Sequence, residues 1–226
     1  MYQLSPNVPR FGLLVNQKAG RFAALGRTRL ERLLARMNVA AHAPIVYCEG
    51  ETLAQRALEL AQSGVDAVAI YGGDGSARSV IEALRHTDIP VLPLPGGTLN
   101  RLCHRVHGHA HLKPILAKLD QARPIWLSGG RANEHLFLVA AGFGPWMAFE
   151  RVREVARHGG VRAGLGALRD VRHTLFDGEL ALQGRLSHAD IIVAAPGAVD
   201  GAFGLGDRNT AIAADHGLEV VAARLG

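Results

Sequence analysis

The sequence predicts an α/β domain with a mostly parallel sheet over residues 1–124, followed by a β-rich, antiparallel, sandwich-like domain over residues 125–226. In the first part, short apolar runs alternate with amphipathic helical patterns, which is typical of a parallel sheet covered by helices. In the second part, strand-like runs follow one another with glycine-rich turns between them, as in antiparallel sandwiches. The change of pattern near Pro124 marks the expected domain boundary.

Four apolar runs predict the strands of the first part, and each is followed by glycine or polar residues. They cover residues 11–15, 43–47, 67–71 and 91–94. Because helical patterns separate these runs, we expect neighbouring strands to run parallel.

Helical periodicity and capping residues predict helices between the strands. Leucines 30, 33 and 34 with Met37 form one apolar stripe. Thr52 is the expected N-cap of a helix that ends near Gln62. Val80, Ile81 and Leu84 line the next helix. A further helix is expected to begin near Thr98.

The second part contains mostly short strand patterns. Strands are expected at residues 125–127 and 135–140, around a turn at residues 129–131. Two helical segments follow, at residues 147–157 and 163–175. The remaining expected strands cover residues 179–182, 191–194, 210–213 and 218–222.

Composition excludes several classes of protein. The 226 residues are 48% hydrophobic and 20% charged, which excludes a disordered chain. Two cysteines, Cys48 and Cys103, cannot form a disulfide framework. The N-terminus lacks a signal-peptide pattern, and the most apolar stretch, residues 136–149, is broken by glycine and proline. We therefore expect a cytoplasmic protein.

The charge balance is positive, with 25 Lys and Arg against 20 Asp and Glu. This balance favours a phosphorylated ligand or an anionic membrane surface as partner. Arg29, Arg32 and Arg36 share one helical face, which is either a solvated face or a point of peripheral contact with the inner face of a membrane. Aromatic residues are only 5% and no nucleic-acid-binding motif occurs, so nucleic acid is not an expected partner.

Three polar, glycine-containing loops follow strands of the parallel sheet. We call residues 16–20 the first loop, residues 72–76 the second loop and residues 95–100 the third loop; their sequences are NQKAG, GGDGS and PGGTLN. Ligands of parallel sheets bind beyond the carboxyl ends of the strands, so the three loops are expected to lie together. Glycines there let backbone N–H groups approach phosphate oxygens.

Each loop taken singly also has a purely structural interpretation. Gly72 and Gly73 suit a tight turn from strand to helix, while Asp74 and Thr98 suit helix N-caps. Asp74 is the most informative residue, because a carboxylate among phosphate-binding glycines is well placed to meet a metal ion.

These three loops, in this order and spacing, resemble the signature loops of the diacylglycerol kinase catalytic domain, a superfamily of lipid kinases with an NAD-kinase-like nucleotide domain. Residues 136–145 and 204–221 resemble segments of the family's second domain, so the resemblance covers almost the whole chain. It implies transfer of the γ-phosphoryl group of ATP, with Mg²⁺, to a lipid hydroxyl.

The resemblance also implies roles for individual residues. Asp74 organises the metal and the phosphates, and Asp215, in a turn like the family's Asp-Asp-Gly-Leu turn, is a second metal candidate. The residues implied at the nucleotide are Asn16, Lys18, Gly72, Gly73, Gly75, Ser76, Gly97, Thr98 and Asn100.

The sequence also departs from the family pattern. Gln17 stands where proline is common, Ser76 where threonine is usual, and Arg101 where many members have an acidic residue. Family members usually continue into a segment whose Asp-Gly-Glu motif carries the proposed general base. We therefore expect an incomplete second domain and low turnover. Glu179, in a similar triplet, is interpreted as part of a polar turn and is not assigned as the base.

Two other functions stay open at this stage. A non-catalytic relative that binds nucleotide or lipid would need the loops but no general base. An NAD-kinase-like enzyme shares the Gly-Gly-Asp-Gly sequence, although the third loop argues against it. The sequence does not identify the lipid, and it leaves open whether the chain forms a homodimer. The cluster Cys103, His104, His107, His109 and His111 is interpreted as helix end and solvated loop, without a metal.

Overall fold

The computed structural model describes residues 9–36, 44–143, 178–182, 185–189, 191–196 and 218–223. The chain forms two compact units, Met1–Leu127 and Ser128–Gly226, and each is described by itself. None of the helices in the described ranges is both long and apolar enough to cross a bilayer.

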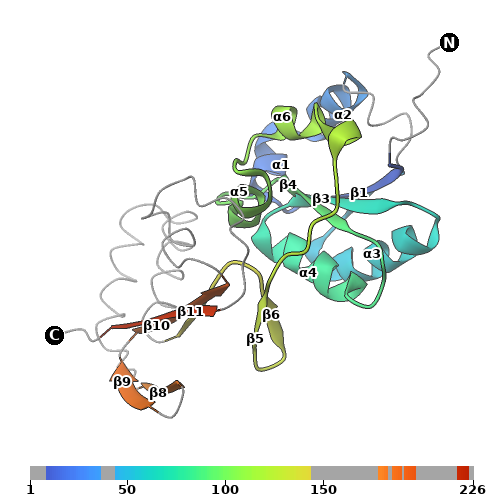
Figure 1. The fold of residues 1–226 in the computed structure, drawn as a ribbon. Coiled ribbons are helices and arrows are strands. Elements are labelled where there is room, and N and C mark those ends of the chain that lie inside the picture. Colours follow the sequence, from blue (N-terminus) through green and yellow to red (C-terminus); the bar gives the residue numbers. More distant parts are fainter. Residues whose placement is uncertain are drawn as a thin grey trace. The chain divides into compact units, whose positions relative to one another are not determined.

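The N-terminal unit is built on a four-stranded parallel sheet (Figure 1). Its strands are β1 (Phe11–Asn16), β2 (Ile45–Cys48), β3 (Ala67–Gly72) and β4 (Val91–Pro95), in the order β2-β1-β3-β4. All three pairings are parallel, with Leu14 opposite Ile70 in β1 and β3, for example. The apolar runs therefore predicted all four strands, and their direction, correctly.

Helices cover both faces of this sheet (Figure 1). On one side lie α1 (Gly20–Leu25), α2 (Arg27–Arg36) and α6 (Leu112–Leu116), followed by the 3₁₀ turn η2 (Leu119–Gln121). On the other lie α3 (Leu53–Gln62), preceded by the 3₁₀ turn η1 (Gly50–Thr52), and α4 (Asp74–Leu84). The seven-residue helix α5 (Arg101–His107) follows β4.

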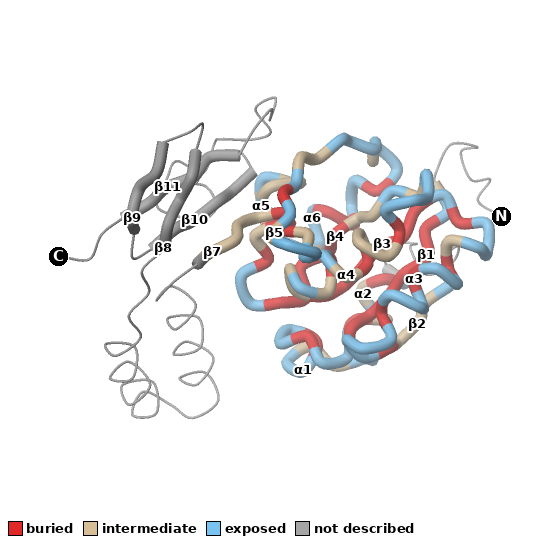
Figure 2. The backbone as a smooth tube through the Cα atoms, turned by 90° about the horizontal axis from the view of Figure 1, so that it is seen from below, coloured by how far each residue is buried: buried red, intermediate tan, exposed pale blue. Residues whose placement is uncertain are grey.

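Side-chain alternation along the strands divides the core between the two faces. Leu13 and Val15 of β1 pack in one cluster with Leu30 and Leu34 of α2 and with Leu116 of α6. The intervening residues point to the other face, as expected for a strand. Strands β1 and β3 are buried along their whole length (Figure 2), which explains why both read as nearly continuous apolar runs.

One expected helix start is right and another is wrong. Thr52 lies at the N-cap position of α3, which ends at Gln62 as expected, although its hydroxyl donates to the Glu49 carbonyl at 3.2 Å and makes no capping bond to the helix. The helix expected near Thr98 begins three residues later, at Arg101. Asn100 lies before it with a left-handed backbone (φ 50°), so the chain cannot be helical from Thr98 onward.

The second unit contains short antiparallel pairings. A hairpin joins β5 (Gly130–Ala132) to β6 (His135–Phe137), β7 (Ala141–Phe143) pairs with β10 (Ile191–Pro196), and β10 pairs with β11 (Leu218–Ala223). The strands β8 (Gly178–Leu182) and β9 (Arg185–Ala189) form a further pair. The antiparallel character of this part is as expected.

Some details of the second part differ from expectation. Residues 125–127 form no strand, and Trp126 among them is fully exposed. The hairpin turns at Asn133, whose φ is 51°, instead of at residues 129–131. Glu179 lies within β8 and not in a turn. The helices expected at residues 147–157 and 163–175 and the strand at 210–213 lie outside the described residues.

Candidate active site

The three loops meet at the carboxyl edge of the parallel sheet, because β1, β3 and β4 are neighbours in it. The Asn16 Nδ2 group donates to the Ser76 hydroxyl at 2.8 Å, which joins the first loop to the second. The Gly97 N–H donates to the Gly72 carbonyl at 3.1 Å, which joins the third loop to the second. The loops therefore form one continuous surface, as their positions in the sequence predicted.

Glycine is required where the second and third loops touch. A Cβ atom on Gly97 would lie 2.5 Å from the Gly73 Cα, a backbone atom that has no room to move aside. Gly75 is different, since a Cβ atom there would meet nothing within 4 Å. Packing therefore explains Gly97 and leaves Gly75 facing open space, where a ligand can approach the backbone.

Asn100 is buried inside the third loop and not directed at a ligand. Only 1% of it is exposed. Its Oδ1 accepts from the Gly97 N–H and its Nδ2 donates to the Gly97 carbonyl, both at 2.8 Å. Asn16 has a comparable place in the first loop, where its Oδ1 accepts from the Lys18 N–H at 3.0 Å. Both side chains hold loop backbone in place.

Asp74 connects the second loop to α5. Its Oδ2 accepts from the Arg101 N–H at 3.0 Å and its Oδ1 from the Leu102 N–H at 2.8 Å. The carboxylate thus satisfies two backbone donors that the start of a helix leaves without intrahelical partners. Each oxygen keeps further lone-pair capacity, because a carboxylate offers about four acceptor sites.

The N-terminus of α4 is open to an anion. This helix is eleven residues long, and no side chain caps it at Gly73. Its first turn comprises residues of the glycine-containing second loop, whose N–H groups have no intrahelical acceptor. A helix N-terminus with little side-chain cover binds phosphate through these N–H groups and the helix dipole.

Lys18 and Thr98 lie on the exposed side of the loops. The Lys18 ammonium is 2.7 Å from a Glu49 carboxylate oxygen, just beyond β2. The hydrogen bond with Glu49 raises the pKa of Lys18, so the ammonium is charged at any physiological pH. Thr98 is exposed, and its hydroxyl would be 3.6 Å from a Cβ atom placed on Gly20.

The metal candidates are only partly described. Within the residues that the structure describes, no three His, Cys, Asp or Glu side chains form a group that could hold a metal ion. Asp74 is therefore a single carboxylate, which suits an ion that is otherwise bound by phosphate oxygens and water, as Mg²⁺ often is. Asp215 lies outside the described residues, and the side chain of Glu179 is likewise not described.

Sequence reasoning missed one residue beside the loops, Arg21. The Arg21 N–H donates to the Gly96 carbonyl at 2.9 Å and its guanidinium donates to the Ala110 carbonyl at 3.2 Å. The position of Arg21 directly after the first loop is the sequence feature that could have identified it. Cys103, a member of the Cys-His cluster noted in the sequence, is buried on α5, where burial and then the charge of Asp74 raise the pKa of its thiol to about 12. That thiol is protonated at neutral pH and unsuited to nucleophilic chemistry.

Comparison with known proteins agrees with the loop geometry. The model of the family described as diacylglycerol kinase catalytic domain matches residues 10–128. Among solved structures, a candidate diacylglycerol kinase from Bacillus anthracis str. Sterne has 23% identity and a TM-score of 0.62, over 86% of this chain and 67% of its own. A second from that strain has 22% identity and a TM-score of 0.63, over 88% and 70% of the two chains.

A third structure, of diacylglycerol kinases from the same strain, has 20% identity and a TM-score of 0.59, over 84% of this chain and 64% of that one. The chain thus spans about two thirds of the length of the structures it matches. At these identities the likeness shows a shared fold.

Proposed function

Because the chain belongs to the diacylglycerol kinase catalytic domain family, we propose that it transfers the γ-phosphoryl group of ATP to a lipid hydroxyl. The single observation that carries this proposal is the uncapped N-terminus of α4, framed by three hydrogen-bonded loops at one edge of the sheet. Phosphoryl transfer needs mainly positioning and neutralisation of charge, and this arrangement can supply both.

In the proposed complex, backbone N–H groups from Gly73 to Ser76 bind the phosphates. The absence of any atom near a Cβ on Gly75 supports this, since a phosphate oxygen can come close to the backbone there. The contact of Gly97 with Gly73 and the two hydrogen bonds of Asn100 keep the loops from rearranging. We therefore assign Asn16, Gly72, Gly97 and Asn100 to holding the site and not to touching the nucleotide.

Asp74 is the proposed protein ligand of Mg²⁺, with Asp215 as a further candidate. A bound Mg²⁺ would neutralise charge on the phosphates and stabilise the transferring phosphoryl group. The two N–H bonds to Asp74 orient its carboxylate and leave each oxygen able to face outward. The same bonds set the position of α5 relative to the second loop.

Lys18 and Thr98 are the proposed side-chain contacts of the nucleotide. The Lys18 pair with Glu49 is solvent-exposed, with 64% of the lysine side chain accessible. Exposed ion pairs contribute little to folding, so exchanging Glu49 for a phosphate oxygen costs little. The hydroxyls of Thr98 and Ser76 add neutral donors on either side of the phosphates.

Lipid phosphorylation with radiolabelled ATP tests the proposal. The full chain is incubated with ATP, Mg²⁺ and mixed micelles that contain diacylglycerol, ceramide or sphingosine, and labelled lipid is measured. We expect label in at least one lipid, and none without Mg²⁺. Labelled NADP formed from NAD in a parallel reaction would favour the NAD-kinase-like alternative.

The non-catalytic alternative has its own supporting observation, because both oxygens of Asp74 already accept bonds from the chain. It predicts that calorimetry detects ATP binding while no acceptor gains label. That pair of results would overturn the kinase proposal and leave a nucleotide-binding role.

A further inference from the structure

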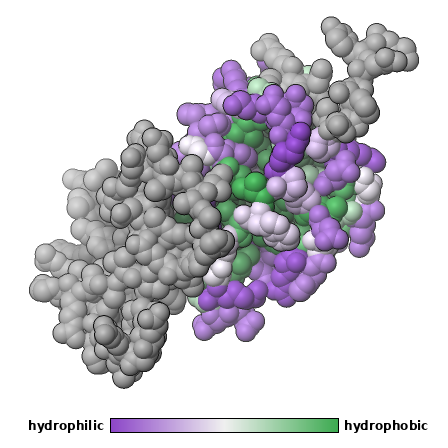
Figure 3. All heavy atoms as spheres, in the orientation of Figure 1, coloured by the Kyte–Doolittle hydropathy of each residue, from purple (hydrophilic) through white to green (hydrophobic). Residues whose placement is uncertain are grey.

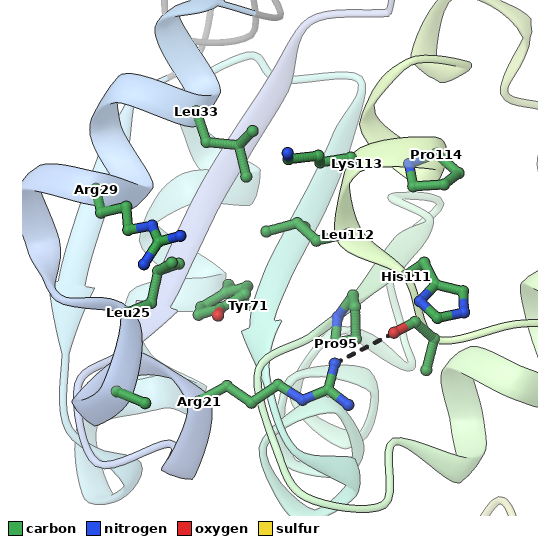
Figure 4. Close-up of a pocket in the computed structure, with 12 residues that line it drawn as sticks. Arg21, Leu25, Arg29, Leu33, Tyr71, Pro95, His111, Leu112, Lys113 and Pro114 are labelled. Atoms are coloured by element: carbon green, nitrogen blue, oxygen red, sulfur yellow. Dashed lines mark hydrogen bonds between the residues drawn. The ribbon is translucent and has the colours of Figure 1, made fainter.

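A cavity of about 590 Å³ lies on the side of the sheet that α1, α2 and α6 cover (Figure 4). Residues of α1 and α2 form one wall and residues 110–114 form the opposite wall. Tyr71 and Pro95, at the ends of β3 and β4, also line it. Its volume falls in the range of small-molecule sites. The cavity borders the second and third loops through Tyr71 and Pro95, but none of its lining residues belongs to α4.

Cationic side chains border this cavity without acidic neighbours. Arg21, Arg29 and Lys113 are among its lining residues, and Arg29 and Lys113 extend toward each other from opposite walls (Figure 4). The lining includes no Asp or Glu. Within the described ranges, none of the three cations takes part in a salt bridge, although four other pairs form there. Their positive charge is therefore available to an anion.

The remaining lining is largely apolar. Leu25, Leu33 and Leu112 are half-buried and border the cavity. In Figure 3 hydrophobic side chains likewise gather in a central area of the N-terminal unit, bordered by hydrophilic ones. A ligand that suits leucine walls and a cationic rim has an apolar body and an anionic end.

Tyr71 adds a polar group that the fold itself does not use. It is 2% exposed, and in the described part of the chain no hydrogen bond of its hydroxyl is found. Burial raises the pKa of Tyr71, while the nearby charge of Arg21 opposes this rise. The Tyr71 hydroxyl is not one of the described buried polar atoms that lack a partner, so it is accessible from the cavity, where a polar ligand atom can bind it.

We propose that this cavity binds a single-chain anionic amphiphile, meaning one acyl chain that carries a carboxylate or a phosphate monoester. The chain packs against Leu25, Leu33 and Leu112, and the acidic end meets Arg29 and Lys113. The Tyr71 hydroxyl donates to a polar atom of the ligand. The occupant follows from charge complementarity, because three cations without a salt bridge in the described part of the chain disfavour both a neutral lipid and an apolar peptide.

Displacement of a fluorescent fatty acid from the full chain tests the proposal. The competitors are oleate, lysophosphatidate, neutral monooleoylglycerol and inorganic phosphate, each below its micelle concentration. We expect oleate and lysophosphatidate to compete, and the tighter of the two identifies the preferred acid. Monooleoylglycerol is expected to bind at least about tenfold more weakly, and inorganic phosphate alone not to compete. Equal affinity for the neutral lipid, or displacement by phosphate alone, would overturn the proposal.

Charge-reversal variants locate the site. Arg29→Glu and Lys113→Glu are each expected to weaken oleate binding about tenfold, because each reverses a cation on the rim. Matched controls are Arg32→Glu on the same helix and Lys118→Glu just after α6, both exposed and outside the lining. The controls are expected to change affinity less than about twofold. Equal losses of oleate affinity in the variants and the controls would mean that oleate is held by general charge attraction. Unchanged affinity in all four proteins would mean that oleate binds elsewhere.

Two further measurements separate this proposal from the kinase proposal. Tyr71→Phe keeps the ring and removes the hydroxyl, and we expect weaker oleate binding with an unchanged melting temperature. ATP affinity is measured on the same variants and is expected to stay within about twofold of the parent for Arg29→Glu and Lys113→Glu. These measurements therefore test amphiphile binding independently of whether the chain phosphorylates a lipid.

Discussion

Polar side chains have different roles in two regions of the carboxyl edge of the parallel sheet. We call the region of Asp74 and Asn100 the middle of this edge, and the region of Lys18 and Glu49 its flank. In the middle, Asp74 and Asn100 direct their polar atoms to backbone groups of the third loop and α5. At the flank, Lys18 is exposed and forms an ion pair with Glu49. The comparison teaches that a polar residue in a glycine-containing loop often shapes the loop, and that only some such residues are exposed where a ligand can reach them.

This difference has a measurable consequence. Changes in the middle of the edge alter the fold and the chemistry together, because the same atoms serve both. If the proposed site is right, we expect changes at the flank to alter ligand affinity alone. The predictions below separate the two regions, beginning with the largest effect.

The largest effect is expected for Asp74→Asn. The amide keeps the size of the carboxylate but removes its charge, so lipid phosphorylation falls by about 10²–10³-fold, as when one group that stabilises transition-state charge is lost. The amide also presents N–H groups to one of two backbone donors, and stability falls by about 1 kcal/mol. Radiolabel transfer and thermal melting measure the two effects.

Asp66→Asn is the matched control for Asp74→Asn. The Asp66 carboxylate also accepts a backbone N–H, that of Arg10 at 2.7 Å, but it lies at the amino end of β3. We expect a similar loss of stability without a loss of turnover per folded molecule. Equal turnover losses in both variants would show that Asp74 acts only through stability.

Gly97→Ala is expected to have the next largest effect. The new methyl group would lie 2.5 Å from the Gly73 Cα, so the second and third loops must separate. Overpacking of this kind costs about 1–3 kcal/mol, and denaturant unfolding measures it. Gly75→Ala is the comparison, since a Cβ there meets nothing within 4 Å. That variant keeps or gains stability, because alanine favours a helix, but loses ATP affinity.

Lys18→Gln tests the flank. We expect ATP affinity to fall by about twofold to fivefold, the range of exposed ion pairs, while the melting temperature is unchanged. Calorimetric titration with ATP gives the affinity. Glu49→Gln is the control, because it frees the Lys18 ammonium and leaves ATP affinity equal or higher. A lowered melting temperature in Lys18→Gln would place Lys18 with the residues that hold the fold.

The smallest effect concerns His107 at the end of α5. Burial lowers the pKa of this histidine below its ordinary value of 6.5, and its Nε2 lies 2.9 Å from the Pro93 carbonyl. The unfolded chain therefore takes up this proton more readily, so stability falls as pH drops through about 6.5 toward the lower pKa of the folded state. Thermal melts from pH 8 to 5 measure this. His107→Gln, which can still donate to the Pro93 carbonyl, should flatten that part of the profile.

The sequence predicted most of the parallel domain, because buried strands and amphipathic helices leave strong periodic patterns. It failed where one residue adopts an unusual backbone conformation. Nothing in the composition near Thr98 reveals that Asn100 is left-handed, so the start of α5 was placed too early. The strand predicted at residues 125–127 was wrong for another reason. Three apolar residues in a row suit a strand, but these residues pair with no other strand in the described part of the chain.

The candidate site was predictable to the level of loops but not of side-chain roles. Spacing alone brought the three loops together, since their strands are neighbours. It could not reveal that the Asp74 carboxylate also accepts bonds from residues 27 and 28 positions further along the chain. The cavity beside Tyr71 depends on tertiary contact between α1, α2 and residues 110–114, for which no local pattern exists.

Backbone amide NMR during titration with a non-hydrolysable ATP analogue and Mg²⁺ tests the central claim most directly, namely that the N-terminus of α4 is the phosphate site. We expect the largest shifts at the amides of Gly73, Gly75 and Ser76, smaller ones at Lys18 and Thr98, and little change at Arg29 or Lys113. Shifts concentrated at residues 110–114 and α2, with the amides of α4 unmoved, would contradict the account.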